Sequence, residues 1–380
     1  MVAIVVAIAA PAAAQDAPTF FSRTSLSGYI DTYYAYNRNH PATPCAVVNG
    51  VEIFNCLHAF DVANNSFSIN LAALAVEKVP TADSRVGFRV DLGFGSGPAL
   101  IAGEQSEPNG PSKNFQQAYG SYLVSDRGAL RVDVGKFVTP AGFEKIDPLQ
   151  DWNASRSLLF ALAIPREHVG VRTLWVPNSH IAVTGVVGNG WSDLTPNPGG
   201  KLAGASVAVR PFDRLTVTET YLGGVESGVD LDGWRDLSDT IVVARIANQL
   251  SLAINADFGR DRRTLQSWQG EAAYLRYEVT RWFAITPRLE ALRDPNGFMT
   301  GVAQDLQEAT ATAEFRDPRG FVLRLEYRVD VVDRPFFLKT VSTTVRTQSI
   351  ASANCVVFFN SHKASRSEQG GVPSALWKEQ

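Results

Sequence analysis

The sequence predicts an all-β fold: a transmembrane antiparallel β-barrel of about 16 strands, with short periplasmic turns and longer external loops. Three observations carry this prediction: apolar and polar residues alternate, the alternating segments are long, and the connections between them alternate in length. No helical apolar stripe persists for more than a couple of turns, and after the first residues no apolar run is long enough for a membrane helix. The 380 residues are therefore predicted to form one barrel domain.

Alternation is clearest in residues 84–95, 250–259 and 320–333. In SRVGFRVDLGFG, one face carries Val86, Phe88, Val90, Leu92 and Phe94, and the other carries Arg85, Arg89 and Asp91. Successive strand side chains point to opposite faces, so these segments have one apolar and one charged side. They run for roughly nine to thirteen residues, as a tilted membrane strand requires. Soluble strands are typically about five or six residues long.

The connections support the same fold. Candidate strands begin near Thr24, Ser66, Ser84, Asn114, Ala129, Glu167, Ser179, Lys201, Asp213, Ser238, Leu250, Ser267, Trp282, Asp305, Gly320 and Thr343. Tight turns such as PTADS and SDRG alternate with long connections that start near Arg38, Ser96, Thr139, Trp191, Gly223, Arg260, Asp294 and Arg334. This asymmetry is typical of outer-membrane barrels, and an even strand count places both termini at the short-turn, periplasmic rim.

The chain ends are predicted separately. Residues 1–14 combine an apolar run with Ala12-Ala13-Ala14, which is typical of a secretory signal peptide, although no Lys or Arg precedes the run. A buried N-terminal strand is the alternative. Residues 15–23 would lead into a barrel that spans 24–359. Residues 360–380 follow Phe358-Phe359 as a polar, disordered tail.

The three cysteines have separate predictions. Cys45 and Cys56 lie in one polar stretch, and in an oxidising compartment they are expected to form a disulfide. Two independent thiols are the alternative. Cys355 lies in an alternating apolar segment and is predicted to be a buried, inert thiol.

Composition and motifs exclude several functions. The net charge of −3 is too small for a nucleic-acid footprint. No HExxH, GxSxG or P-loop motif occurs, so neither an enzyme, a cofactor nor a metal site is predicted. Asp230, Asp232, Asp236 and Asp239 are expected to form a solvated external loop, with a Ca²⁺ site as the less favoured alternative.

A barrel of this size encloses an aqueous channel. The charged faces of the strands predict a lumen lined by Arg85, Arg89, Asp91, Arg131, Asp133, Arg172, Arg288, Glu290, Arg324, Glu326, Arg328 and Asp330. Opposed charges across a narrow pore would tune its selectivity, or they would simply pair across strands. The mixed signs favour neither anions nor cations.

Several segments together resemble a known family. They are GKFVTPAGFEKIDPLQDWNASRSLLF, AIPREHVGVR, RLEALRDPNG and FVLRLEYRVDVVDRPFF. They resemble the OmpL-like family of β-barrel porins in Gram-negative outer membranes. The shared positions are Gly135, Lys136, Phe137, Pro140, Gly142, Glu144, Ser155, Arg156, Ser157, Phe160, Pro165, Gly170, Arg172, Glu326, Tyr327, Arg328 and Asp330. The resemblance implies a channel-forming barrel and no particular substrate.

Residues 139–165 form the third long connection, and they do not alternate. In general porins the third external loop narrows the pore, and the resemblance suggests the same constriction here. Its charged residues would lie in the lumen: Glu144, Lys145, Asp147, Asp151 and Arg156. Its apolar residues would anchor it to the wall: Phe143, Trp152, Leu158, Leu159 and Phe160. A surface loop packed on its own aromatic residues is the alternative.

The predicted function is passive diffusion of small hydrophilic solutes or ions through a porin in outer-membrane lipid. A solute-selective channel of the same fold is one alternative. A non-conducting barrel that acts as an adhesin or receptor is another alternative. Loops much longer than the ones in this sequence would favour that function. Porins of this size often assemble into homo-oligomers.

Overall fold

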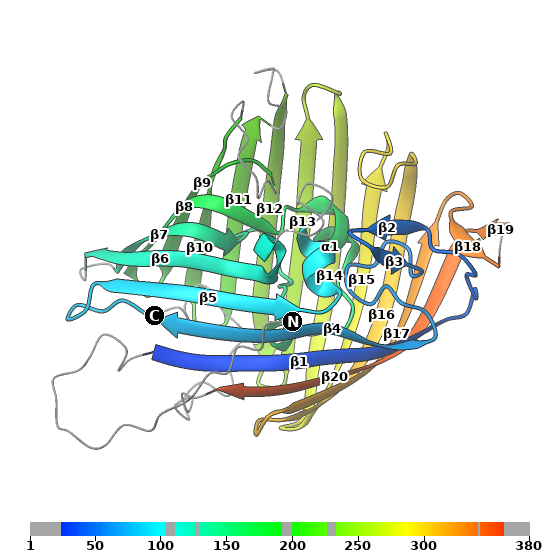
Figure 1. The fold of residues 1–380 in the computed structure, drawn as a ribbon, viewed down its shortest axis with the longest axis horizontal. Coiled ribbons are helices and arrows are strands. Elements are labelled where there is room, and N and C mark those ends of the chain that lie inside the picture. The colour runs from blue at the N-terminus through cyan, green and yellow to red at the C-terminus, as the bar shows by residue number, and fades with distance from the viewer. Residues whose placement is uncertain are drawn as a thin grey trace.

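The computed structural model describes residues 24–102, 111–125, 129–191, 200–225, 233–340 and 343–360. Sixteen of its strands close into one antiparallel barrel, in which β1 pairs with both β4 and β20 (Figure 1). The predicted fold class and strand count are confirmed. No described helix is long and apolar enough to cross a membrane.

The barrel strands keep chain order around the wall. They are β1 (Thr24–Asn37), β4 (Ser66–Lys78), β5 (Val86–Phe94), β6 (Phe115–Ser125), β7 (Leu130–Val138), β8 (Glu167–Asn178), β9 (Ile181–Gly188), β10 (Leu202–Phe212), β11 (Leu215–Val225), β12 (Trp234–Ala247), β13 (Leu250–Asp261), β14 (Gln266–Thr280), β15 (Phe283–Asp294), β16 (Gln304–Asp317), β17 (Phe321–Val332) and β20 (Thr347–Asn360). Short connections lie at one rim and most of the long ones at the other, as the sequence predicts. The connection expected to be long after Arg260 is wrong: it comprises only residues 262–265, because β13 and β14 continue outward to Asp261 and from Gln266.

The long connections contain the remaining elements. The first contains the hairpin of β2 (Ala46–Val48) and β3 (Val51–Ile53), and the last contains the hairpin of β18 (Phe337–Lys339) and β19 (Thr343–Val345). The second contains helix α1 (Gly97–Ala102) and the 3-10 turn η1 (Pro111–Asn114). The third contains the 3-10 turn η2 (Pro148–Gln150) and the π-helical turn η3 (Leu159–Ala163).

Two predicted strand starts are wrong. The strand expected near Thr343 begins at Thr347, because Thr343–Val345 pairs with β18 instead. The strand expected near Ser238 begins at Trp234, because its alternation continues outward through a paired register with β11 and β13. Asp236 and Asp239 therefore lie in a strand and not in an acidic loop, whereas Asp230 and Asp232 fall outside the described residues.

The two faces of the barrel differ as the alternation predicts. In β17, Arg328 and Asp330 are about 1% exposed, whereas Leu325 and Tyr327 are 46% and 42% exposed. Exposed apolar side chains on the outer face suit a lipid environment. Glu219 is an outward exception in β11, and its carboxylate accepts hydrogen bonds from the Ser238 and Thr240 hydroxyls at 2.7 and 2.5 Å.

The cysteine positions are partly as expected. Cys45 and Cys56 form a disulfide, with their Cα atoms 6.1 Å apart. Cys355 is half-buried rather than buried, because it occupies an outward position of β20 next to the inward Val356. The predicted signal peptide, the lead at residues 15–23 and the tail from residue 361 lie outside the described residues.

Candidate functional site

Residues 139–165, here called the inner loop, leave β7 and fold into the barrel before the chain enters β8. Gly142 has a φ of 84°, a left-handed conformation that glycine adopts without strain. Asp147 caps η2 by accepting a hydrogen bond from Leu149 N at 2.9 Å, and Pro148 begins the turn. These local features make a compact chain path without strands, so the loop's backbone groups need partners elsewhere.

Carboxylates of the opposite wall accept hydrogen bonds from the loop backbone. Glu326 accepts from Ala154 N at 2.7 Å and from Ser155 N at 2.9 Å. Glu290 accepts from Leu158 N at 2.8 and 2.9 Å. These two glutamates therefore satisfy three backbone donors in the middle of the buried loop.

Guanidinium groups of the same wall donate to the loop carbonyls. Arg324 donates to Pro148 O at 2.9 Å and to Asp151 O at 2.8 Å. Arg328 donates to Arg156 O at 2.6 Å. Arg288 donates to Ser155 O at 2.8 Å. Strands β15, β16 and β17, here called the charged wall, therefore supply the hydrogen bonds that water would give an exposed loop.

The charges of this wall also neutralise one another. Arg288 pairs with Glu308 of β16 and with Glu144 of the loop, both at 2.9 Å. Arg324 pairs with Glu314 at 2.8 Å, and Arg328 pairs with Asp330 at 2.7 Å. Because each arginine is 1% exposed or less, these pairs are shielded from solvent. Removing one partner of such a pair leaves an uncompensated buried charge.

Apolar contacts complete the seat of the inner loop. The Phe143 ring lies 5.2 Å from Trp152 and 4.8 Å from Tyr274 of β14. Leu159 packs over Gly270, where a Cβ atom would lie 2.4 Å from Leu159 Cδ2. This strand position therefore needs glycine to admit the loop.

The charged residues predicted for the loop separate into two groups. Glu144, Asp151 and Arg156 are at most 3% exposed and lie in the contact between loop and wall. Arg156 pairs with Asp151 at 2.9 Å and donates to the Lys145, Ala154 and Ile146 carbonyls, so it holds the loop's own path. Lys145 and Asp147 instead line an open cavity.

The first long connection packs on the inner loop. Phe60 lies 5.7 Å from Phe160, and the Arg156 guanidinium lies 5.0 Å above the Phe60 ring. His58 bridges Asp61 at 2.7 Å and Asp330 of the charged wall at 3.3 Å. Burial and Arg328 disfavour the imidazolium, but the two carboxylates outweigh both and raise the pKa of His58. The sequence gives no periodic signal for this contact.

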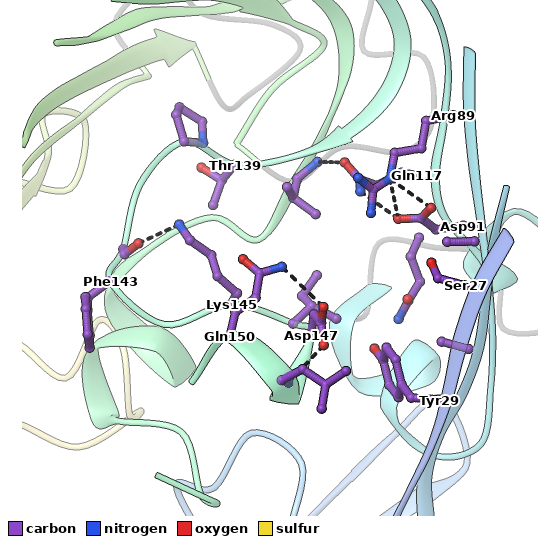
Figure 2. A pocket seen from close by; sticks show the side chains of 18 of the residues that line it. Ser27, Tyr29, Arg89, Asp91, Gln117, Thr139, Phe143, Lys145, Asp147 and Gln150 are labelled. Atoms are coloured by element: carbon purple, nitrogen blue, oxygen red, sulfur yellow. Dashed lines mark hydrogen bonds and ion pairs between the residues drawn. The ribbon is translucent and has the colours of Figure 1, made fainter. Parts of the chain in front are cut away.

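The cavity has a volume of about 440 Å³ and lies between the inner loop and the rest of the wall. Figure 2 shows Arg89, Asp91 and Gln117 on one side of it and Lys145, Asp147 and Gln150 on another. Its lining extends from Phe358 and Asn360, at the short-turn end of β20, to Gln117 and Val138, near the long-loop ends of β6 and β7. The lining therefore extends from one rim toward the other.

The charges near this cavity are paired within the wall. Arg89 pairs with Asp91 at 2.9 Å and with Glu77 at 3.5 Å. Asp133 accepts from Arg172 at 2.8 Å and from Arg131 at 3.1 Å. Of these residues, Arg89, Asp91 and Arg172 line the cavity.

Other predicted lumen residues lie away from the cavity. Arg85 donates to the Leu123 and Val124 carbonyls at 3.1 Å, near the short-turn rim. The predicted residues of the charged wall do not line the cavity. Arg288, Glu290, Arg324, Glu326 and Arg328 bond to the inner loop, and Asp330 contacts His58 of the first long connection.

Residues 181–188, 202–209 and 215–225 of β9, β10 and β11, here called the uncharged wall, border the cavity instead. Within 181–188, 202–209 and 215–225 the sole charged residue is Glu219, which points outward. Thr184, Ala208, Thr216 and Thr218 line the cavity from these strands.

Sequence reasoning missed two acceptors for the start of the inner loop. Asp239 accepts from Gly142 N at 3.0 Å, and Asn255 accepts from Phe143 N at 2.8 Å. The alternating polar face of β13 contains Asn255 and is a signal in the sequence, whereas Asp239 is predicted in a loop and lies in β12. Within the part of the chain that the structure describes, no group of three His, Cys, Asp or Glu side chains could hold a metal ion.

The sequence matches the family model described as "Putative beta-barrel porin-2, OmpL-like" over residues 23–359. No curated protein matches the chain significantly.

Solved structures with the same fold include three porins. OmpF of Salmonella typhi, in complex with daunomycin, has a TM-score of 0.60 and 11% identity, covering 88% of this chain and 97% of that chain. An anion-selective porin from Comamonas acidovorans has a TM-score of 0.58 and 10% identity, covering 88% and 99%. The trimer form of in-vitro folded OmpT of Vibrio cholerae has a TM-score of 0.58 and 10% identity, also covering 88% and 99%.

Proposed function

The chain belongs to the OmpL-like β-barrel porin family and is an outer-membrane porin, and from that premise we propose that it carries small hydrophilic solutes and ions by passive diffusion. The proposed passage runs between the inner loop and the strands that the loop leaves uncovered, and the loop sets its width. The supporting observation is the cavity of about 440 Å³, whose lining includes both loop and wall residues. The family and fold are those of a channel, and no enzymatic activity is part of the proposal.

The orientation and assembly of the barrel are part of the same proposal. Thr24 and Asn360 both lie at the short-turn rim, which we assign to the periplasm. Because a solved structure of the same fold is a trimer form, we propose that this chain also forms homo-oligomers. Cross-linking of protein folded in outer-membrane lipid would give bands above the monomer, and a single monomer band would contradict this assignment.

Cysteine labelling of β11 tests the passage directly. In a Cys355→Ser background, Thr218→Cys places a thiol on the cavity, and Val217→Cys places one on the outer face of the same strand. A charged, membrane-impermeant thiol reagent should reduce single-channel conductance of the Thr218 variant only. Equal effects on both variants, or on neither, would contradict the proposed route.

Shortening the inner loop tests its role as the constriction. Deleting residues 146–155 should raise single-channel conductance, because it removes Ile146, Asp147, Leu149 and Gln150 from the cavity lining. The deletion also leaves Glu326 without its loop partners and removes the Ser155 contacts of Arg288, so folding must be checked by the heat-dependent shift of gel mobility. Unchanged conductance of a folded deletion variant would reject the constriction.

A further inference from the structure

We infer that this passage favours small amphipathic solutes, which have one apolar side and one polar end, over solutes of equal size that are polar on every side. The inference rests on the proposed channel function and specifies its solute class. It comes from the distribution of charge around the cavity and not from the net charge of the lining.

One side of the cavity is apolar. Ile241 and Val243 of β12 line it, together with Leu174 of β8 and Ala208 of β10. Threonines of the neighbouring strands, such as Thr218, also line this side and present a methyl group beside the hydroxyl. Within residues 181–188, 202–209 and 215–225 of β9, β10 and β11, no charged side chain faces inward, and Arg210, near the short-turn end of β10, does not line the cavity.

Most charges lie on another side, and Arg172 of β8, which also lines the cavity, is paired with Asp133 at 2.8 Å. Arg89 and Asp91 of β5 are paired with each other, and Lys145 and Asp147 project from the inner loop (Figure 2). A zwitterionic or singly charged end of a solute would interact with these groups. Its apolar side would then contact the wall at Ile241 and Val243, where a solute hydroxyl finds few partners.

Valine and threonine provide a matched pair of probes. They have nearly the same shape and the same charged ends, and they differ by a methyl group in place of a hydroxyl. An apolar wall favours the methyl group because contact with it removes apolar surface from water. Flux into liposomes that contain the folded, full-length chain should therefore be at least about twofold higher for L-valine than for L-threonine.

Variants of the wall change this ratio in opposite directions. The double variant Ile241→Thr, Val243→Thr should bring the valine-to-threonine ratio close to one. Thr218→Val extends the apolar surface and should raise the ratio, so the inference stays testable if the double variant does not fold. Val242→Thr is the matched control, because Val242 pairs with Ile254 on the outer face and does not line the cavity.

The outcomes separate the two proposals. A wild-type ratio of one or less, or a ratio that neither the double variant nor Thr218→Val changes, would overturn the inference and leave the channel intact. Absence of flux for both amino acids in folded wild-type protein would overturn the channel proposal itself, and the inference with it.

Discussion

The charged wall and the uncharged wall face the same barrel interior but have opposite relations to solvent. Arg288, Arg324 and Arg328 belong to the wall with the denser charge and are at most 1% exposed. The uncharged wall contributes Thr184, Thr216 and Thr218 to the open cavity. A ladder of inward charges in a barrel is therefore not evidence that those charges contact water.

The chemistry of the inner loop accounts for the difference. A loop without strands has backbone donors and acceptors that need partners when it is buried. The charged wall offers both kinds of partner, such as Glu326 for the Ser155 N–H and Arg324 for the Asp151 carbonyl. A wall of threonine, alanine and valine offers few strong hydrogen bonds, so the loop lies on the charged wall and the space remains on the other side.

The largest effect is expected from Arg288→Met, which removes the cation between Glu144, Glu290 and Glu308. The remaining carboxylates would keep only the more distant Arg328, 4.0 Å from Glu308, and the loss in the free energy of unfolding should be about 3–5 kcal/mol. The loop should also detach more often, which single-channel recording would show as more frequent transitions to a higher conductance.

Arg293→Met is the control for this variant. Arg293 belongs to the same strand, but it points outward and is exposed at the long-loop end. Its substitution should change neither stability nor channel noise appreciably. Equal effects of the two variants would show that the contact between the loop and the charged wall is not what stabilises the barrel.

A smaller effect of the same kind is expected from Glu326→Gln. The amide can still accept one hydrogen bond from the loop, but it loses the charge that strengthens the bonds to Ala154 N and Ser155 N. The expected loss is about 1–2 kcal/mol in the free energy of unfolding. Glu278→Gln at the exposed end of β14 is the control, and a loss of similar size there would contradict the role of Glu326.

The inward face of the charged wall can be predicted from the sequence, but its contact with the inner loop cannot. Alternation such as Arg324-Leu325-Glu326-Tyr327 fixes the strand and its inward face, because the side-chain period of a strand is two. It cannot state what covers that face, since Glu326 bonds to Ala154, which is 172 residues away in sequence. The inner loop itself was expected in the lumen. Within this loop, Arg156 is buried and Lys145 lines the cavity. That difference depends on packing, for which the local sequence has no signal.

A charge placed on the uncharged wall should alter selectivity rather than stability. Thr216→Asp adds a carboxylate to the cavity lining, where solvent can hydrate it. The reversal potential in a KCl gradient should shift toward cation preference. Thr216→Asn has almost the same size without the charge, so it should leave the reversal potential unchanged, and a shift in both variants would contradict an electrostatic cause.

The smallest effect is expected from His58, which joins the first long connection to the charged wall through Asp330. Asp61 and Asp330 raise the pKa of His58 above its usual value, in spite of burial and Arg328. The folded state therefore holds the proton more tightly than the unfolded state does. The stabilisation is complete below about pH 6.5, the usual histidine pKa, and is lost as pH rises through the higher folded pKa.

His58→Gln should remove this part of the pH dependence. Unfolding of the detergent-solubilised barrel, followed from acidic to alkaline pH, should show the largest gap between wild type and variant below about pH 6.5, with the gap closing as pH rises. His180→Gln is the control, because His180 is exposed at a short turn and its imidazole contacts the Arg210 carbonyl at 2.8 Å rather than a carboxylate. A gap that widens as pH rises would mean that His58 is buried as the neutral imidazole. In that case His58 would join the first long connection to the charged wall through hydrogen bonds and not through an ion pair. The acidic and basic side chains of the charged wall would then have to neutralise one another without a charge on His58.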